Sequence, residues 1–191
     1  KAHPHVWIDL ESQFEFDTEG RITGLKIDWT FDELYTAFVV TDAGGPEAMD
    51  QETLTEIGRR NLANLRDFNY FTEFLADGAI QPLAVPETFD MGLKDGKLWL
   101  RFSVPLETPL VPADHRISYA GFDPSYYVEI LHVDGGHRLP AENGPDGCET
   151  VLEEPNPTTE ALTLAESLDR IDTAPESFGA LFAQRVRLEC T

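Results

Sequence analysis

Apolar and polar residues alternate along two consecutive stretches near the beginning of the chain. In residues 6–16 most even positions are apolar, and in residues 25–32 the odd positions are apolar. A period of two is typical of a β-strand that buries one face. Residues 17–20, with the sequence DTEG, form a turn signal between the two stretches. The pattern therefore predicts an antiparallel hairpin.

The turn also predicts how the two strands pair. If residues 17–20 form the loop, Ile8 faces Trp29, and each apolar residue of one strand faces an apolar residue of the other. The same register places His5 opposite Asp32 on the other face of the hairpin, with His3 just beyond. We therefore expect two imidazoles and a carboxylate at the end of the hairpin farthest from the turn.

The remainder of the chain predicts more strands and a smaller number of helices. Strand patterns cover residues 70–75, 83–93, 97–106, 116–122, 126–133, 148–153 and 186–190. Helical patterns cover residues 32–40, the stretch after residue 51, residues 157–171 and residues 178–184. We expect an α+β fold that is mainly antiparallel β, sandwich-like, with about three packed helices. We expect residues 1–191 to form one domain, with a helical insertion near 32–69 and C-terminal helices near 157–184.

The charge of the chain narrows the range of partners. It has 14 basic and 35 acidic residues, and a net charge of -21. Such a chain repels phosphate backbones and anionic lipid headgroups, so we expect no nucleic-acid partner. No stretch approaches the roughly 18 consecutive apolar residues of a membrane span, so we expect no membrane insertion of the mature chain.

Only two cysteines occur, Cys148 and Cys190, each near a predicted strand. A disulfide between them is the simplest interpretation, and it would require an oxidising compartment. Two buried free thiols in a cytosolic protein are the alternative. The spacing fits neither a redox centre nor a zinc finger.

Sequence motifs of common enzymes are missing. The chain has no G-x-S-x-G, no H-E-x-x-H, no phosphate-binding glycine loop and no G-x-G-x-x-G after a strand. The acidic loop that starts at Asp42 lacks the ligand spacing of an EF-hand, because its third and fifth positions are Gly44 and Pro46. We therefore expect a protein that is not an enzyme.

His3 and His5 are the most specific candidates for metal binding. Residues two apart on a strand project to one face, with Cα atoms about 6.5 Å apart, close enough for both imidazoles to bind one ion. Neutral imidazoles suit zinc, copper and nickel, and Asp32 could complete the site or orient an imidazole. The alternative is a pair of exposed histidines on a mobile terminus.

The other histidines are weaker candidates. His132 shares the parity of the apolar residues of its strand, so we expect it to be half-buried and hydrogen-bonded. His115 and His137 lie in predicted loops, where solvation is the default. The stretch from Asp123 to Tyr127 is a predicted turn that carries an aromatic pair.

Several segments together resemble one bacterial family. They are AHPHVWID at residues 2–9, DWTFDELYTAF at 28–38, FDPSYYVEI at 122–130, the Gly147-Cys148 pair, and RVRLEC at 185–190. The chain is similar, nearly end to end, to an uncharacterised family of periplasmic components of ABC-type transport systems. Genes of that family often lie beside, or are fused to, nickel/cobalt-type permeases. The resemblance implies an exported, periplasmic protein whose signal peptide is removed at or near the HPH motif.

Residues and resemblance together predict a transition-metal-binding accessory protein of the periplasm. It would supply or sense a divalent ion, zinc or copper before nickel or cobalt, for an inner-membrane metal permease or ABC transporter. His3 and His5 would be ligands, Asp32 a ligand or an orienting partner, and Asp123 a weaker contributor. A metal-dependent periplasmic enzyme and a metal-free interaction module of a transport system are the alternatives.

Overall fold

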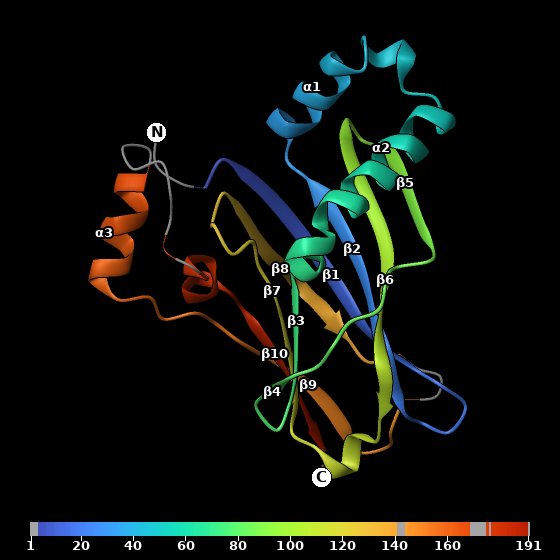
Figure 1. Cartoon of the computed structure of the whole chain (residues 1–191), viewed down its shortest axis with the longest axis vertical. Helices are drawn as coiled ribbons and strands as arrows, with labels where there is room; N and C mark the ends of the chain where they lie inside the picture. Colours follow the sequence, from blue (N-terminus) through green and yellow to red (C-terminus); the bar gives the residue numbers. More distant parts are fainter. Residues whose placement is uncertain (1–3, 141–143, 169–174, 176, 191) are drawn as a thin grey trace.

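A computed structural model describes residues 4–140, 144–168, 175 and 177–190. Over these residues the chain forms ten strands, arranged in two five-stranded sheets, and three α-helices. Among the described strands, the neighbours β1 and β8 are parallel, and the other seven neighbouring pairs are antiparallel. This arrangement confirms the predicted α+β fold (Figure 1).

The elements follow one another in chain order. The strands are β1 (Val6–Phe16), β2 (Ile22–Phe31), β3 (Thr72–Ala76), β4 (Ala79–Ile80), β5 (Phe89–Lys94), β6 (Lys97–Leu110), β7 (Ile117–Gly121), β8 (Val128–Arg138), β9 (Cys148–Glu153) and β10 (Arg185–Cys190). The α-helices are α1 (Glu33–Asp42), α2 (Gln51–Leu65) and α3 (Thr159–Ser167). Short 3-10 helices are η1 (Pro46–Ala48), η2 (Arg66–Phe71), η3 (Pro112–Asp114) and η5 (Phe178–Phe182).

The two sheets enclose the main hydrophobic core. The first sheet has the order β5-β6-β2-β1-β8, and the second has the order β4-β3-β7-β10-β9. Phe14 of β1 packs edge to face against Phe74 of β3 and Tyr119 of β7, with ring centroids 6.3 and 5.1 Å apart. All three side chains are almost fully buried. The contacts join the sheets face to face, as in a sandwich.

The β1–β2 hairpin forms as predicted, but its register is shifted by two residues. Ile8 pairs with Phe31 and Leu10 with Trp29, whereas the sequence predicted Ile8 opposite Trp29. The loop spans residues 17–21, and a bulge at Glu15/Phe16 adds a further residue. A shift of two keeps the parity, so the same apolar side chains face the core. It moves Asp32 opposite Trp7, and the predicted pairing of His5 with Asp32 is wrong.

Helices α1 and α2 lie between β2 and β3 in the sequence and cover one end of the first sheet (Figure 1). Gly58 of α2 packs closely on β5, since an added Cβ would lie 2.8 Å from the Phe89 ring. The cap of α2 is Asp50, whose side chain accepts from the Thr53 backbone N–H. The helix begins at Gln51, at the start of the predicted helical stretch.

Helix α3 and η5 build a second, smaller cluster around Tyr126. The Tyr126 ring stacks on Phe182, with centroids 4.0 Å apart. Thr158 caps α3 through the Ala161 N–H, and the helix starts at Thr159, two residues later than predicted. The predicted end of this helix at residue 171 lies outside the described residues.

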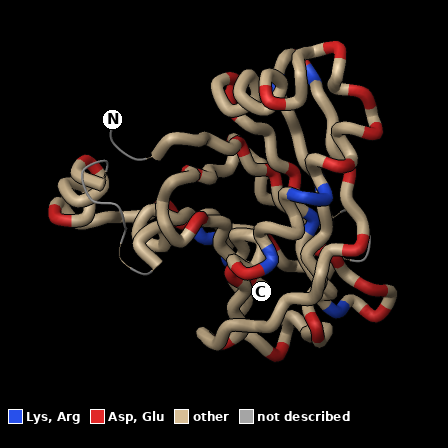
Figure 2. The backbone as a smooth tube through the Cα atoms, turned by 45° about the horizontal axis from the view of Figure 1, so that its top comes forward, with Lys and Arg blue, Asp and Glu red and all other residues tan. Residues whose placement is uncertain are grey.

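Acidic residues are distributed over the whole fold (Figure 2). They occur on both sheets and on all three α-helices, and basic residues are few. Among the helices that the structure describes, none is long and apolar enough to cross a bilayer.

Candidate functional site

The beginning of β1 is fixed by backbone hydrogen bonds on both sides. The His5 N–H donates to the Tyr127 carbonyl oxygen at 2.8 Å, just before β1 pairs in parallel with β8. On the other side the Asp32 N–H donates to the Trp7 carbonyl at 2.9 Å. The backbone at His5 is therefore held by the turn before β8, and the backbone at Trp7 by the end of β2.

Asp32 accepts three backbone hydrogen bonds. Oδ1 accepts from the N–H groups of Leu34 and Tyr35 at 2.8 and 2.9 Å, which caps α1. Oδ2 accepts from the Trp7 N–H at 2.9 Å. The carboxylate therefore joins the start of the helix to β1, and both oxygens already have donors.

Asp123 organises the turn that precedes β8. It is buried, and its carboxylate accepts from the Ser125 N–H, the Ser125 hydroxyl and the Val128 N–H at 2.8 to 3.0 Å. Tyr126, inside this turn, has a φ of 59°, a left-handed conformation that is costly for a bulky residue. The predicted turn with its aromatic pair is confirmed, and Asp123 fixes its shape.

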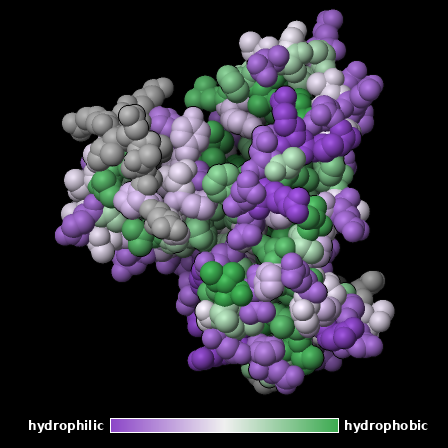
Figure 3. Space-filling view, viewed as in Figure 1, coloured by the Kyte–Doolittle hydropathy of each residue, from purple (hydrophilic) through white to green (hydrophobic). Residues whose placement is uncertain are grey.

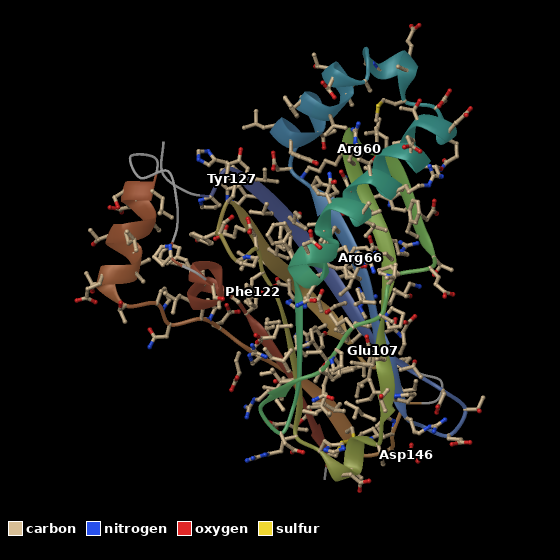
Figure 4. The ribbon with its side chains drawn as sticks, viewed as in Figure 1. Arg60, Arg66, Glu107, Phe122, Tyr127 and Asp146 are labelled. Carbon is tan, nitrogen blue, oxygen red and sulfur yellow. A yellow bond between two sulfur atoms is a disulfide. The ribbon has the colours of Figure 1, made fainter. Side chains whose placement is uncertain are left out.

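The His5 and Tyr127 rings are in contact, with centroids 4.9 Å apart and planes inclined by 35°. This contact brings the first and third of the resembling segments together at one end of the first sheet (Figure 4). His3 lies outside the described residues. Within the described ranges, no three His, Cys, Asp or Glu side chains converge as a metal site would require. Of the two predicted histidine ligands, the described residues include only His5, which is partly buried and whose ring lies beside Tyr127.

Large apolar side chains are exposed at the same end of the molecule. Trp7 is 42% exposed, Tyr127 49%, Leu34 73% and Phe38 68%. Leu34 and Phe38 are four residues apart on α1 and therefore lie on the same face of the helix. Exposed apolar groups that cluster in this way are typical of interaction surfaces.

His132 belongs to a buried polar network between the sheets. Its Nε2 lies 2.7 Å from Ser12 Oγ, which in turn lies 2.6 Å from the Tyr119 hydroxyl. Gln184 Oε1 accepts from the His132 N–H at 2.7 Å, and the Gln184 amide donates to Glu154. Burial lowers the pKa of His132 to about 4, so this imidazole is neutral at pH 7. The prediction of a hydrogen-bonded, half-buried histidine is confirmed.

His137 and His115 also have polar partners, and the His137 ring lies 6.0 Å from that of His132. His137 lies in β8 and not in a loop, and its Nδ1 is 3.0 Å from Thr150 Oγ1. The β1–β8 register shifts between Leu10, which pairs with His132, and Ser12, which pairs with His137. Strand β8 therefore continues past this shift and includes His137. His115 lies in a connection, as predicted, where its Nδ1 is 2.7 Å from Asp77 Oδ2.

The predicted disulfide is present. Cys148 and Cys190 face each other on the paired strands β9 and β10, and their sulfur atoms are bonded. They lie far from His5, because β10 ends at the bottom of the molecule in Figure 1 and β1 begins near its top. The bond is compatible with an exported protein.

Two features were missed in the sequence although signals for them exist. Ser12 lies on the buried face of β1 between Leu10 and Phe14. A polar residue at such a position could have indicated a buried hydrogen bond. Leu34 and Phe38 share a face of a helix whose opposite face is also apolar, which could have marked an uncovered surface. A helix that is apolar on all sides has more apolar surface than a single sheet can cover.

Comparison with known proteins shows the family. The model of a family described as "Protein of unknown function (DUF1007)" matches residues 1–190. A protein of Haemophilus influenzae, described as "Uncharacterized protein", is 26% identical over 195 residues, which cover 99% of this chain and 91% of that protein. The chain therefore belongs to the DUF1007 family.

Proposed function

We propose that this protein binds a divalent transition metal ion in the periplasm and presents it to an inner-membrane permease or ABC transporter. The observation that carries the proposal is the fixed position of His5 at the start of β1. Its backbone is hydrogen-bonded to Tyr127 and its ring lies against the Tyr127 ring. An imidazole that is held in place loses less freedom when it binds an ion than one on a loose chain.

The ligands in this proposal are His3 and His5. If the extended backbone of β1 continues beyond Pro4, strand parity places both imidazoles on the solvent face of the first sheet, with Cα atoms roughly 6.5 Å apart. Two neutral imidazoles suit zinc or copper, and also nickel or cobalt. Water or a side chain of the transporter would complete the coordination, which leaves the ion accessible for transfer.

Asp32 and Asp123 act in this proposal as positioning residues. Their oxygens accept backbone hydrogen bonds at 2.8 to 3.0 Å, and metal coordination would have to replace those bonds. They hold the two segments between which His5 lies. Asp32 would act here through the Trp7 backbone and not through the direct contact with an imidazole that the sequence predicted.

Two features support a location outside the cytoplasm. The Cys148–Cys190 disulfide requires an oxidising compartment to persist. The segments that resemble periplasmic transport components also point there. Export would place the metal site on the side of the inner membrane from which a permease takes up its ion.

Calorimetric titration with Zn(II), Cu(II) and Ni(II) tests the metal site. We expect one ion to bind per chain, and the affinity to fall at least tenfold in a His3→Ala/His5→Ala variant. A His115→Ala variant is the matched control, because that imidazole pairs with Asp77 elsewhere. Since imidazole binds metal only when neutral, acidification should release the ion. Unchanged affinity in the double variant would refute the proposal.

The exposed apolar side chains favour a second candidate, a protein-interaction module. Leu34 and Phe38 on α1 lie at the same end of the fold as His5 and could dock on a transporter with or without metal. A Leu34→Ser/Phe38→Ser variant should then lose transporter-dependent metal uptake in cells and keep its zinc affinity in solution. Ile80→Ser/Val85→Ser changes two exposed apolar residues elsewhere and serves as the control. Normal uptake with the α1 variant would exclude this surface.

A further inference from the structure

A cavity of about 200 Å³ lies between the core face of the first sheet and the end of α2. Its floor comes from four strands, β1, β2, β6 and β8, and its other walls come from α1, α2, η2 and the turn before β8. Tyr127 and Asn64, both exposed, line its opening to solvent. Figure 3 shows the surface hollowed in the upper centre of the view, with apolar side chains around the hollow.

Aromatic rings dominate the walls. Phe31 stacks on Tyr35 with centroids 4.9 Å apart, and Trp29 lies 6.3 Å from both Phe31 and Phe71. These four rings and Tyr127 all line the cavity. Rings with apolar faces and polarised edges favour another aromatic ring in offset or edge-to-face contact.

The polar groups of the lining are few and uncharged. They come from Tyr35, Asn61 and Asn64 on one side of the cavity, and the lining includes no Lys, Arg, Asp or Glu. Burial raises the pKa of Tyr35, so its hydroxyl stays protonated, and its side chain hydrogen-bonds to Asn61. A charged ligand would have no partner of opposite charge in this lining, whereas a neutral one could pair with the hydroxyl and amides.

Unusual backbone conformations hold two of the aromatic walls in position. Asn69, Tyr70 and Phe71 have φ values of 50°, 55° and 53° in succession, and Tyr126, next to Tyr127, has a φ of 59°. Such conformations are costly for bulky side chains and are concentrated at ligand-binding and active sites. The two segments are joined by the Phe122 N–H, which donates to the Phe71 carbonyl at 2.9 Å. The rings of Phe71 and Tyr127 are thus presented to the cavity by segments that are bonded to each other.

We propose that this cavity binds a small, neutral aromatic molecule with one hydrogen-bonding group directed at Tyr35 and the amides of α2. A cavity of about 150 Å³ with apolar walls accepts benzene, so 200 Å³ accommodates one ring with a few additional atoms. The inference goes beyond the proposed metal-binding function and does not depend on it. It assigns a second, organic ligand to the protein.

The probe for this site is 4-fluorophenol, observed by ¹⁹F NMR with metal-free protein in EDTA. We expect saturable binding of one equivalent, and displacement by indole but not by choline. Tyr35→Phe keeps the ring and removes the hydroxyl, and it should weaken binding about tenfold. Because EDTA removes any bound ion, failure here leaves the metal proposal unaffected.

A substitution at the opening separates binding in the cavity from binding elsewhere. Asn64→Trp places a large ring at the opening from an exposed position, so the fold should be kept and binding should fall at least tenfold. Ala63→Trp changes the neighbouring exposed residue, which is not part of the lining, and should bind as the natural protein does. Displacement by choline, equal binding by both tryptophan variants, or no saturable binding would each overturn the proposal.

Discussion

Carboxylates that accept several backbone hydrogen bonds fix the chain around them, and Asp32 and Asp123 both act in this way. Asp32 binds the N–H groups of Trp7, Leu34 and Tyr35, and Asp123 binds those of Ser125 and Val128. Asp32 was predicted to contribute to a metal site because the predicted register placed it opposite His5, and Asp123 was predicted as a weaker contributor. Their hydrogen bonds suit a positioning role, in which they set the location of His5 without touching an ion.

Asp32→Ala should destabilise the fold by about 1–2 kcal/mol, because it removes the cap of α1 and an acceptor for the Trp7 N–H. Urea unfolding measures the loss. Glu33→Ala, at the next and exposed position, is the control and should change stability by less than about 0.5 kcal/mol. Equal stabilities of the two variants would show that Asp32 does not hold β1 to α1.

Pairing between strands decides which distant residues meet. The bulge at Glu15/Phe16 and the longer loop shift the β1–β2 register by two, which places Trp7 and not His5 opposite Asp32. At the other end of the fold, strands β9 and β10 align Cys148 with Cys190, which the disulfide then joins. In the second sheet β9 is an edge strand and β10 is its neighbour.

Loss of the disulfide should lower the free energy of unfolding by about 4 kcal/mol, since the two cysteines are 42 residues apart and the bond restricts the unfolded chain. The Cys148→Ala/Cys190→Ala variant, compared with the natural protein in urea, gives this value. A reducing agent should destabilise the natural protein and leave the variant unchanged. A variant as stable as the oxidised protein would contradict the prediction.

At the scale of the whole molecule, a polar network links the two sheets. Ser12 of β1 and His132 of β8 belong to the first sheet, and Tyr119 of β7 belongs to the second. Gln184, which immediately precedes β10, completes the connection. Because desolvation opposes a charge here, the network is stable with a neutral imidazole.

Acidification should therefore destabilise the protein through His132. Burial lowers its folded pKa from 6.5 to about 4, so between these values the unfolded chain takes up a proton that the folded chain does not. The free energy of unfolding should fall by about 3 kcal/mol at most as the pH drops from 6.5 to 4.

Urea unfolding at several pH values measures this effect. In this pH range, the slope of the unfolding free energy against pH should correspond to about one proton fewer in a His132→Gln variant than in the natural protein. This difference does not depend on the absolute stability of the variant. His115→Gln serves as the comparison, because that side chain lies at the surface beside Asp77. An unchanged slope in the His132 variant would assign the acid sensitivity to other groups.

The sequence predicted the fold class, the hairpin and the disulfide because each depends on a local pattern or on a single pair of residues. Alternation showed which face of β1 is buried, and it also placed His132 correctly. The register was predicted wrongly because a bulge has no clear signature in the residues around Glu15. The cavity could not be foreseen, because its lining comes from elements distant in sequence, such as Trp29, Asn61 and Tyr127.

The most direct test of the metal site is anomalous X-ray scattering from a crystal of the zinc-loaded protein. The proposal predicts one zinc peak within about 2.0–2.1 Å of an imidazole nitrogen of His5, with a second imidazole, that of His3, completing the pair. A zinc ion bound only by carboxylates elsewhere on the surface, with both histidines distant from it, would contradict the account.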